Sequence, residues 1–325
     1  MLCFWDDRQR AHTPSGEFFN GAMHPAAEHS GRIDAILNVL GKTEPVTDFG
    51  EAPILNVHTS EYVVFLRTAH QRWLDAGRSG DAFPYTFPTV HRRALDLNRV
   101  DALLGQFGFD TSTPIGPGTW ESAYCSVQTA LTGLEAVLGG ERCAFAFCRP
   151  PGHHAGADYF GGYCYLNGAA ICAAAANRRV AVLDVDYHHG NGTQDIFAGR
   201  DDVFFASIHA DPSTDYPFFW GHADESHGNI LNLPLPRGTD WSGYAPALAR
   251  AIEWLAQAAP DLLIVSYGAD THEADPISHF KLKTSDYAPM AQEIASMGLP
   301  TLIVMEGGYA VDALGANVAE FLSGF

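Results

Sequence analysis

Three side chains of the types that hold divalent metals follow two apolar stretches of the sequence. Asp186 and His188 end the run VAVLDVDYH, and Asp270 ends the run LLIVSYGAD. In an extended backbone, residues two apart point to the same side, so Asp186 and His188 are expected to converge. Two carboxylates and one imidazole with an open position for water suit a catalytic zinc ion, and they suit iron or manganese as well. The pattern predicts a divalent metal site without choosing the metal.

Two adjacent histidines offer acid–base chemistry. His153 and His154 follow a Pro-Pro-Gly turn in the segment RPPGHHAG, residues 149–156. One imidazole could take a proton from an attacking water while its neighbour stays charged. Each needs a partner on its other ring nitrogen, and Asp184 and Asn191 in DVDYHHGNGT are available. A carboxylate raises the basicity of its histidine more than an amide does, so the two histidines should differ.

A tyrosine after a third apolar run could stabilise a developing negative charge. The segment EGGY, residues 306–309, follows LPTLIVM, and its two glycines permit a tight turn that aims Tyr309 back over the sheet edge. A phenol there could donate a hydrogen bond to an oxyanion. Taken alone, the segment is more often a turn with a packed tyrosine.

The elements that must position these residues alternate between strands and helices. Short apolar runs predict strands over Cys143–Phe147, Val180–Asp186, Val203–Ile208, Leu262–Tyr267 and Leu299–Met305. Helical periodicity is expected over Glu121–Leu138, Asn167–Ala176, Ala245–Ala259 and Tyr287–Met297. Continuous apolar strands separated by helices are typical of a parallel sheet covered on both faces, with working residues at the carboxyl ends of the strands. We therefore expect one α/β domain over residues 1–325, with a Gly-, Pro- and Arg-rich loop insertion at about 77–117.

Composition limits the partners and the compartment. The 325 residues carry 19 Lys plus Arg against 38 Asp plus Glu, a formal net charge of −19. This charge disfavours nucleic-acid binding and favours cationic partners. Asp6 and Asp7 stand where a secretory signal would be basic, no run approaches a membrane span, and the six cysteines form no CxxC pair. We expect a cytoplasmic protein with reduced thiols and no membrane partner.

Several competing catalytic motifs are missing from the sequence. It contains no GxSxG, HExxH or Walker loop. Gly190 and Gly192 begin a GxGxxG pattern, but Asp195 occupies the third glycine position, which argues against a dinucleotide site.

Taken in order, the motifs resemble the histone deacetylase superfamily, zinc amidohydrolases with an arginase-like α/β fold. The resemblance is carried by RPPGHHAG, GGYCYLNGAA at 161–170, DVDYHHGNGT, ASIH at 206–209, GAD at 268–270 and EGGY. Asn191 and Glu306 resemble the class II pattern. PGTW at 117–120, YPFFWGHADE at 216–225 and DPISHFKL at 275–282 are similar to the bacterial acetylpolyamine amidohydrolases, and so is the insertion, which in that subgroup forms a dimer contact.

The resemblance implies a role for each matching residue. The zinc ligands would be Asp186, His188 and Asp270. His154 would be general base and then acid, His153 its electrostatic partner and Tyr309 the donor to the acetyl carbonyl. Asp184 and Asn191 would orient His153 and His154. A structural potassium ion would be held by the side chains of Asp184 and Ser207 and by carbonyls of Asp186, His188 and Ile208.

The resemblance also implies residues that bind the substrate. These would be Gly162, Tyr163, Tyr216, Asp101 and Ile277. Ungapped counting back from PGTW places Ser112 where the subgroup has a glutamate that meets the distal charge of a polyamine, while Asp101 keeps a second acidic position. The resemblance also matches Arg32 with an arginine of the family's internal cavity.

The resulting expectation is a zinc-dependent deacetylase of N-acetylated primary amines, preferentially acetylpolyamines such as acetylputrescine or acetylcadaverine, acting as a homodimer on a cationic small molecule. The alternatives are a deacetylase of acetyl-lysine in peptides or of another small amine, a non-catalytic metal-dependent binder of acylated amines, and a metal oxidoreductase. The tandem histidines together with Tyr309 favour an enzyme over a binder.

Overall fold

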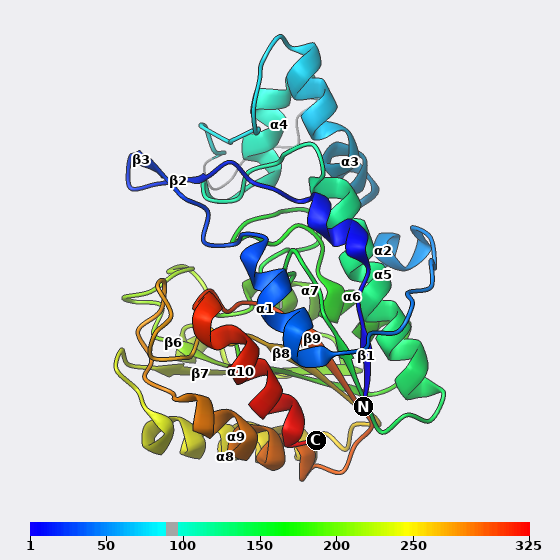
Figure 1. The fold of residues 1–325 in the computed structure, drawn as a ribbon, viewed down its shortest axis with the longest axis vertical. Coiled ribbons are helices and arrows are strands. Elements are labelled where there is room, and N and C mark those ends of the chain that lie inside the picture. The colour runs from blue at the N-terminus through cyan, green and yellow to red at the C-terminus, as the bar shows by residue number, and fades with distance from the viewer. Residues whose placement is uncertain (89–96) are drawn as a thin grey trace.

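The strands of the protein build one parallel sheet of seven strands in the order β1-β4-β9-β8-β5-β6-β7 (Figure 1). The computed structural model describes residues 1–88 and 97–325. The strands are β1 Leu2–Phe4, β4 Cys143–Ala146, β5 Val180–Asp184, β6 Val203–Ala210, β7 Ile230–Leu235, β8 Leu262–Tyr267 and β9 Thr301–Met305. Strands β2 Glu17–Phe19 and β3 Ala22–His24 form a separate antiparallel hairpin. The parallel sheet predicted from the apolar runs is confirmed.

Helices cover both faces of the sheet, as predicted. Along β9, Leu302 and Val304 join one hydrophobic core, whereas Ile303 and Met305 join the other, because successive side chains point to opposite faces. The first core is covered by α2 Ala52–Leu55, α3 Ser60–Asp75, α4 Val100–Phe107, α5 Thr119–Leu138, α6 Gly168–Ala175 and α7 Asn191–Phe197. The second is covered by α1 Gly31–Leu40, α8 Trp241–Gln257, α9 Thr284–Ala295 and α10 Val311–Ser323 (Figure 1). Burial on both faces explains why the strands read as continuous apolar runs.

The two edge strands, β1 and β7, were missing from the expected elements. Strand β7 contains Pro234, which removes a backbone donor and which sequence rules place at edges, where this strand lies. Strand β1 has only three residues. Strand β5 ends at Asp184, two residues earlier than expected, so Asp186 and His188 lie in the loop that follows the strand.

The segment at 77–117, expected as an insertion, supplies no strand to the sheet within its described residues, 77–88 and 97–117. Residues 89–96 lie outside the described part of the chain. The segment does carry α4, whose Phe107 ring stacks on Phe65 of α3 at 4.8 Å between ring centroids. It therefore extends the first core.

Two further expectations concern the cysteines and the membrane. The six cysteines are free, and all but Cys3 are buried. No helix among the described residues is both long enough and apolar enough to cross a membrane.

The order of the strands creates a crevice next to β5. From β5 the chain goes to β6 and β7 on one side and then returns to β8 on the other side. Loops that leave a parallel sheet in opposite directions open a space at the carboxyl ends of the strands, which is where ligands bind in open α/β sheets. The loops after β5, β8, β9 and β4 carry the predicted metal ligands, the two adjacent histidines and Tyr309.

Candidate active site

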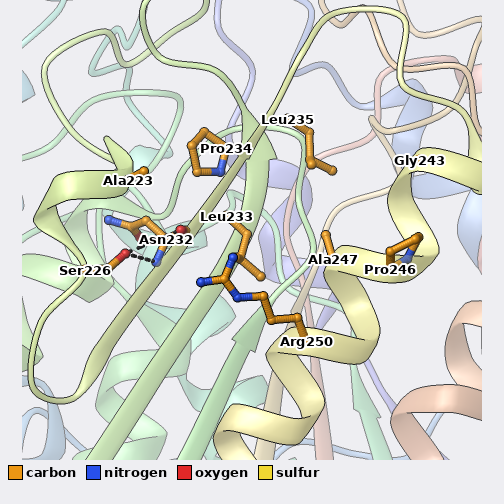
Figure 2. Close-up of a pocket in the computed structure, with 10 residues that line it drawn as sticks. All are labelled: Ala223, Ser226, Asn232, Leu233, Pro234, Leu235, Gly243, Pro246, Ala247 and Arg250. Carbon is orange, nitrogen blue, oxygen red and sulfur yellow. Dashed lines mark hydrogen bonds between the residues drawn. The ribbon is translucent and has the colours of Figure 1, made fainter.

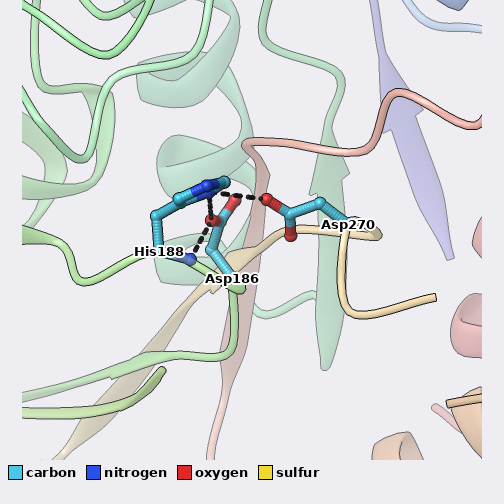
Figure 3. A group of neighbouring side chains, drawn as sticks. All are labelled: Asp186, His188 and Asp270. Carbon is cyan, nitrogen blue, oxygen red and sulfur yellow. Dashed lines mark hydrogen bonds and ion pairs between the residues drawn. The ribbon is translucent and has the colours of Figure 1, made fainter. Parts of the chain in front are cut away.

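The three predicted metal ligands meet beyond the ends of β5 and β8. Their side chains point toward one another in Figure 3, and one ligand atom from each lies within 4.8 Å of the others. His188 Nδ1 is 3.0 Å from Asp270 Oδ2 and 3.4 Å from Asp186 Oδ1. All three residues are buried. The convergence arises in a loop and not in an extended strand as the sequence suggested, because the Asp186 carboxylate accepts the His188 backbone N–H at 2.9 Å.

Backbone N–H groups hold the two carboxylates in place. Gly307 donates to Asp186 Oδ2 at 2.9 Å, and Tyr187 donates to Asp270 Oδ1 at 2.9 Å, leaving Asp270 Oδ2 directed at His188. Position 307 must be glycine for this approach, since a Cβ there would lie 2.6 Å from Asp186 Oδ2 and 2.7 Å from Asp270 Oδ2. Such outer hydrogen bonds orient metal ligands before a metal arrives.

The electrostatics of the three ligands fit a divalent cation. Burial, together with the Asp186 charge, raises the pKa of Asp270 to about 7. Burial alone would lower the pKa of His188, but the carboxylates of Asp186 and Asp270 outweigh it and raise the pKa to about 10. The two buried carboxylates side by side concentrate negative charge around His188, and a divalent ion is the kind of charge that would balance it.

The tandem histidines lie beside this cluster and have different partners. His153 Nδ1 lies 3.0 Å from Asp184 Oδ2, and His154 Nδ1 lies 2.6 Å from Asn191 Oδ1. Burial would lower the pKa of His153, but the Asp186 and Asp184 carboxylates raise it to about 10. Burial and the charges of His153 and His188 hold the pKa of His154 well below its ordinary value. The pair therefore combines one charged and one neutral imidazole.

Glu306 fixes the turn that carries the histidines. Its buried Oε2 accepts the backbone N–H groups of Gly152 at 2.7 Å and His153 at 3.1 Å, and its Oε1 accepts the Ser266 hydroxyl at 3.2 Å. One carboxylate at the end of β9 thus ties the loop after β4 to strand β8. The sequence indicated Glu306 only as part of a family pattern.

Tyr309 follows strand β9 and is held by contacts with two other segments of the chain. Its ring is 7% exposed and meets the Tyr163 ring edge-on, with 5.6 Å between centroids. Arg32 lies over the Tyr309 ring, 5.0 Å from its centroid, and donates to the Gly308 carbonyl at 2.8 Å. These contacts aim the phenol into the same cavity that His154 and His188 line.

This cavity of about 750 Å³ opens from the cluster to the surface. Four of the predicted substrate-binding residues line it: Gly162, Tyr163, Tyr216 and Ile277. Ser112 lines it as well. The Tyr216 ring stands perpendicular to His154, with 5.2 Å between centroids, and stacks on Phe109. The walls are therefore largely aromatic close to the histidines.

Asp101, the fifth predicted substrate-binding residue, does not line this cavity. It lies on α4 in a separate pocket, where Arg78 and Arg99 donate to its carboxylate at 2.5 and 2.6 Å. Two arginines already compensate its charge, and within this chain it does not face the cluster. The acidic residues that line the cavity are Glu17, Asp110 and Asp215. Of these, Asp110 accepts the Tyr216 hydroxyl at 2.9 Å and the Gly162 N–H at 2.6 Å.

Three of the residues expected around potassium, Asp184, Ser207 and Ile208, lie on the neighbouring strands β5 and β6. Asp184 and Ser207 are register partners in β5 and β6, and Ile208 follows Ser207. The Asp184 carboxylate accepts the Asp186 N–H at 3.1 Å, and the Ser207 hydroxyl contacts His209 Nδ1 at 2.8 Å.

A further pocket lies between β7 and α8, and Asp186, His188 and Asp270 do not border it (Figure 2). It is bordered by Asn232, Leu233, Pro246 and Arg250 among others, and none of the predicted site residues lines it.

The sequence did not indicate several residues that support the site. Glu28 and Arg149 lie in a buried network with Arg32, and Asp275 contacts the loop of Tyr309. Asp275 follows a strand exit, so the rule that polar residues collect there could have found it. Glu28 lies outside the strand exits and gives no such signal.

Comparison with known proteins decides the family. The family model "Histone deacetylase domain" matches residues 24–325. The chain belongs to the histone deacetylase family. Acetylpolyamine amidohydrolase 1 of Pseudomonas aeruginosa is 47% identical over 100% of the chain and 99% of the relative. Acetylpolyamine amidohydrolase of Mycoplana ramosa is 40% identical over 100% of the chain and 99% of the relative.

A solved structure of this family has the same fold. The crystal structure of acetylpolyamine aminohydrolase from Burkholderia pseudomallei superposes with a TM-score of 0.94 at 38% identity, covering 100% of this chain and 98% of the other. The expected arginase-like deacetylase fold is thereby confirmed, and the expected resemblance to acetylpolyamine amidohydrolases is confirmed with it.

Proposed function

We propose that the protein is a zinc-dependent amidohydrolase that removes the acetyl group from N-acetylated primary amines, with acetylpolyamines as the preferred substrates. Membership of the histone deacetylase family, with relatives named amidohydrolases, makes the chain a hydrolase of amide bonds. The observation that carries the finer proposal is the convergence of His154, His188 and Tyr309 on one aromatic cavity.

Asp186, His188 and Asp270 would hold the zinc ion. Their buried, converging ligand atoms and the preformed backbone bonds to both carboxylates support this assignment. When bound, zinc supplies Lewis acidity, which polarises a carbonyl and makes water a nucleophile near neutral pH.

The two histidines would divide the proton transfers between them. His154, kept neutral and held through Nδ1 by Asn191, has its Nε2 available to accept a proton from the attacking water and later to give it to the leaving amine. His153, kept charged by Asp186 and Asp184, would stabilise the negative charge that develops nearby.

Tyr309 would donate a hydrogen bond to the acetyl oxygen as it becomes negative. Its contacts with Arg32 and Tyr163 restrict the ring before the substrate arrives, so little reorganisation is needed. Gly162, Tyr163, Tyr216 and Ile277 would enclose the aliphatic chain of the substrate. Asp110, at the cavity wall, adds negative charge that suits a cationic amine.

The potassium ion and the homodimer are further parts of the proposal. Potassium would lie between Asp184 and Ser207 with carbonyls of Asp186, His188 and Ile208. The homodimer is proposed from the similarity of the 77–117 segment to the acetylpolyamine subgroup, and Phe87 and Phe219, both exposed, lie at the cavity where such a contact would narrow the entrance.

The substrate is tested by comparing kcat/KM for acetylputrescine, acetylcadaverine and acetylspermidine with that for acetyl-lysine peptides. We expect the acetylpolyamines to exceed the peptides by at least tenfold. Higher kcat/KM values for the peptides would contradict the polyamine assignment and favour the acetyl-lysine alternative. Binding of all of them without turnover by the zinc-loaded protein would favour the non-catalytic binder.

A further inference from the structure

A buried carboxylate connects the tyrosine loop to the wall of the substrate cavity. Asp275, 6% exposed, lies in the loop after β8, five residues beyond the ligand Asp270. Its Oδ2 accepts the backbone N–H of Tyr309 at 2.7 Å and of Ala310 at 3.2 Å. Its Oδ1 accepts the N–H of Ile277 at 3.1 Å. Both oxygens are therefore used, and each fixes a different loop.

The contact to Tyr309 lies just before the start of a helix. Helix α10 begins at Val311, and Asp275 accepts the N–H groups of Tyr309 and Ala310, the two residues that precede it. The acceptor thus comes from another loop, and its negative charge is favourable near the positive end of the helix dipole. The backbone of Tyr309 is thus fixed by Asp275 and not by its own segment.

The hydrogen bond to Ile277 reaches a residue of the cavity wall. Ile277 and Tyr309 both line the cavity, whereas Asp275 is not among the residues that line it. The side-chain hydrogen bonds of Asp275 go to the backbone of Tyr309, Ala310 and Ile277 and to none of the three metal-cluster residues, although its charge contributes to the raised pKa of Asp270. Its influence on the geometry of the cavity therefore passes through the positions of Tyr309 and Ile277.

We infer that Asp275 is a positioning residue, which sets the distance between the hydroxyl of Tyr309 and the substrate held against Ile277. The inference rests on the proposed function, since it presumes that Tyr309 donates to the acetyl oxygen. A displacement of about 1 Å in such a donor can cost 10²-fold in rate. Asp275, which holds this donor in place, lies outside the cavity and is not one of the residues that line it.

The test is a double-mutant cycle with Asp275→Asn and Tyr309→Phe in the zinc-loaded protein, with kcat and KM measured for acetylputrescine. Asparagine has the shape of aspartate but one acceptor oxygen instead of two, so it loses the contact to one of the two loops. We expect Asp275→Asn alone to lower kcat by about 10- to 100-fold, with a smaller change in KM. In the Tyr309→Phe background the same substitution should change kcat by less than about threefold, because the hydroxyl that it positions is gone.

A purely structural role gives a different result. If Asp275 only stabilises the fold, its effect on kcat should be the same with and without the Tyr309 hydroxyl, and independent effects of this kind would overturn the inference. So would a single Asp275→Asn variant whose kcat stays within about twofold of wild type. Asp240→Asn is the matched control, because Asp240 also accepts an N–H at a helix start, on α8, and does not line the cavity. It should leave kcat unchanged.

Three measurements separate misfolding and failure of the proposed function from failure of this inference. Zinc content and Tm of every variant show whether it is folded and loaded with zinc. If Asp275→Asn does not fold, Asp275→Glu takes its place in the cycle. This variant retains the charge and both oxygens at a shifted position. A crystal structure of the variant should show the Tyr309 side chain displaced, and an unmoved side chain contradicts the inference without reference to activity. If Tyr309→Phe alone leaves kcat unchanged, the proposed oxyanion role fails first, and the inference fails with it.

Discussion

The buried charge network behind Tyr309 allows a stability prediction with a defined size. Glu28 is 1% exposed, and its Oε1 accepts Arg32 at 2.9 Å and Arg149 at 2.8 Å. Both guanidinium groups are fully buried. Glu28→Gln preserves shape and the accepting oxygen but leaves the two cations without the carboxylate that they share. We expect this to destabilise the fold, because an uncompensated buried charge costs about 3–5 kcal/mol.

The pH dependence of stability gives a second estimate of the free energy that the Glu28 carboxylate contributes to folding. Burial alone would raise the pKa of Glu28, but Arg149 and Arg32 outweigh burial and lower it to about 2, from an ordinary 4.5. At about 1.4 kcal/mol for each tenfold change in proton affinity, this corresponds to about 3 kcal/mol. Because the pKa is lower in the folded state, the contribution is complete above pH 4.5 and is lost as the pH falls toward 2.

Differential scanning calorimetry at pH 7 measures the effect. For 325 residues the unfolding entropy is about 0.7 kcal/mol/K, so 3–5 kcal/mol lowers Tm by about 4–7 °C. Glu44→Gln is the control, since its partner Lys42 is 81% exposed and such surface pairs contribute about 0–1 kcal/mol. The difference between wild type and Glu28→Gln should shrink from pH 5 to pH 2, while metal release at low pH affects both proteins alike. A Tm for Glu28→Gln equal to that of the control would refute the reasoning.

Four other predictions concern the metal, the oxyanion and the charge. Asp186→Ala should abolish zinc uptake in elemental analysis, and full stoichiometric zinc would exclude Asp186 as a ligand. Gly307→Ala should lower zinc affinity by about 10- to 100-fold in competition with a chelator, because its Cβ would displace both ligand carboxylates; unchanged affinity would contradict the close approach. Tyr309→Phe should lower kcat by about 10²–10³ with zinc retained, so near-normal turnover would reject the oxyanion role. Finally, kcat/KM for a cationic acetylpolyamine should fall with rising salt concentration, because the net charge of −19 attracts the substrate electrostatically. A kcat/KM that does not change with salt would contradict this electrostatic steering.

The sequence predicted best what depends on local pattern. The five inner strands are visible because burial on both faces makes each a continuous apolar run, and the site residues follow directly from the ends of those runs. The rule that polar residues collect at the carboxyl ends of parallel strands was sufficient to group the loops of His153, Asp186, Asp270 and Tyr309. Those loops come together because the strands before them are neighbours in the sheet.

What the sequence could not predict depends on contacts between distant segments. Strand β7 was obscured by Pro234, and its edge position becomes visible only when the whole sheet is known. Glu28 has its role because Arg32 and Arg149, 4 and 121 residues away, reach the same oxygen. Asp101, an acidic residue at a plausible spacing, pairs with two arginines in another pocket of the same chain. Neither result follows from spacing.

The position of β9 in the sheet has a consequence for how the chain is made. It is the last strand in the sequence, yet it lies between β4 and β8 and joins the pair β1–β4 to the four strands on its other side. During synthesis these two parts of the sheet have no strand-to-strand pairing with each other until residues 301–305 leave the ribosome. The contacts that β9 makes are far apart in sequence, which slows folding and leaves strand edges exposed meanwhile. Glu306 and Tyr309 directly follow this strand, so one late step both joins the sheet and brings these two residues to the site at its edge.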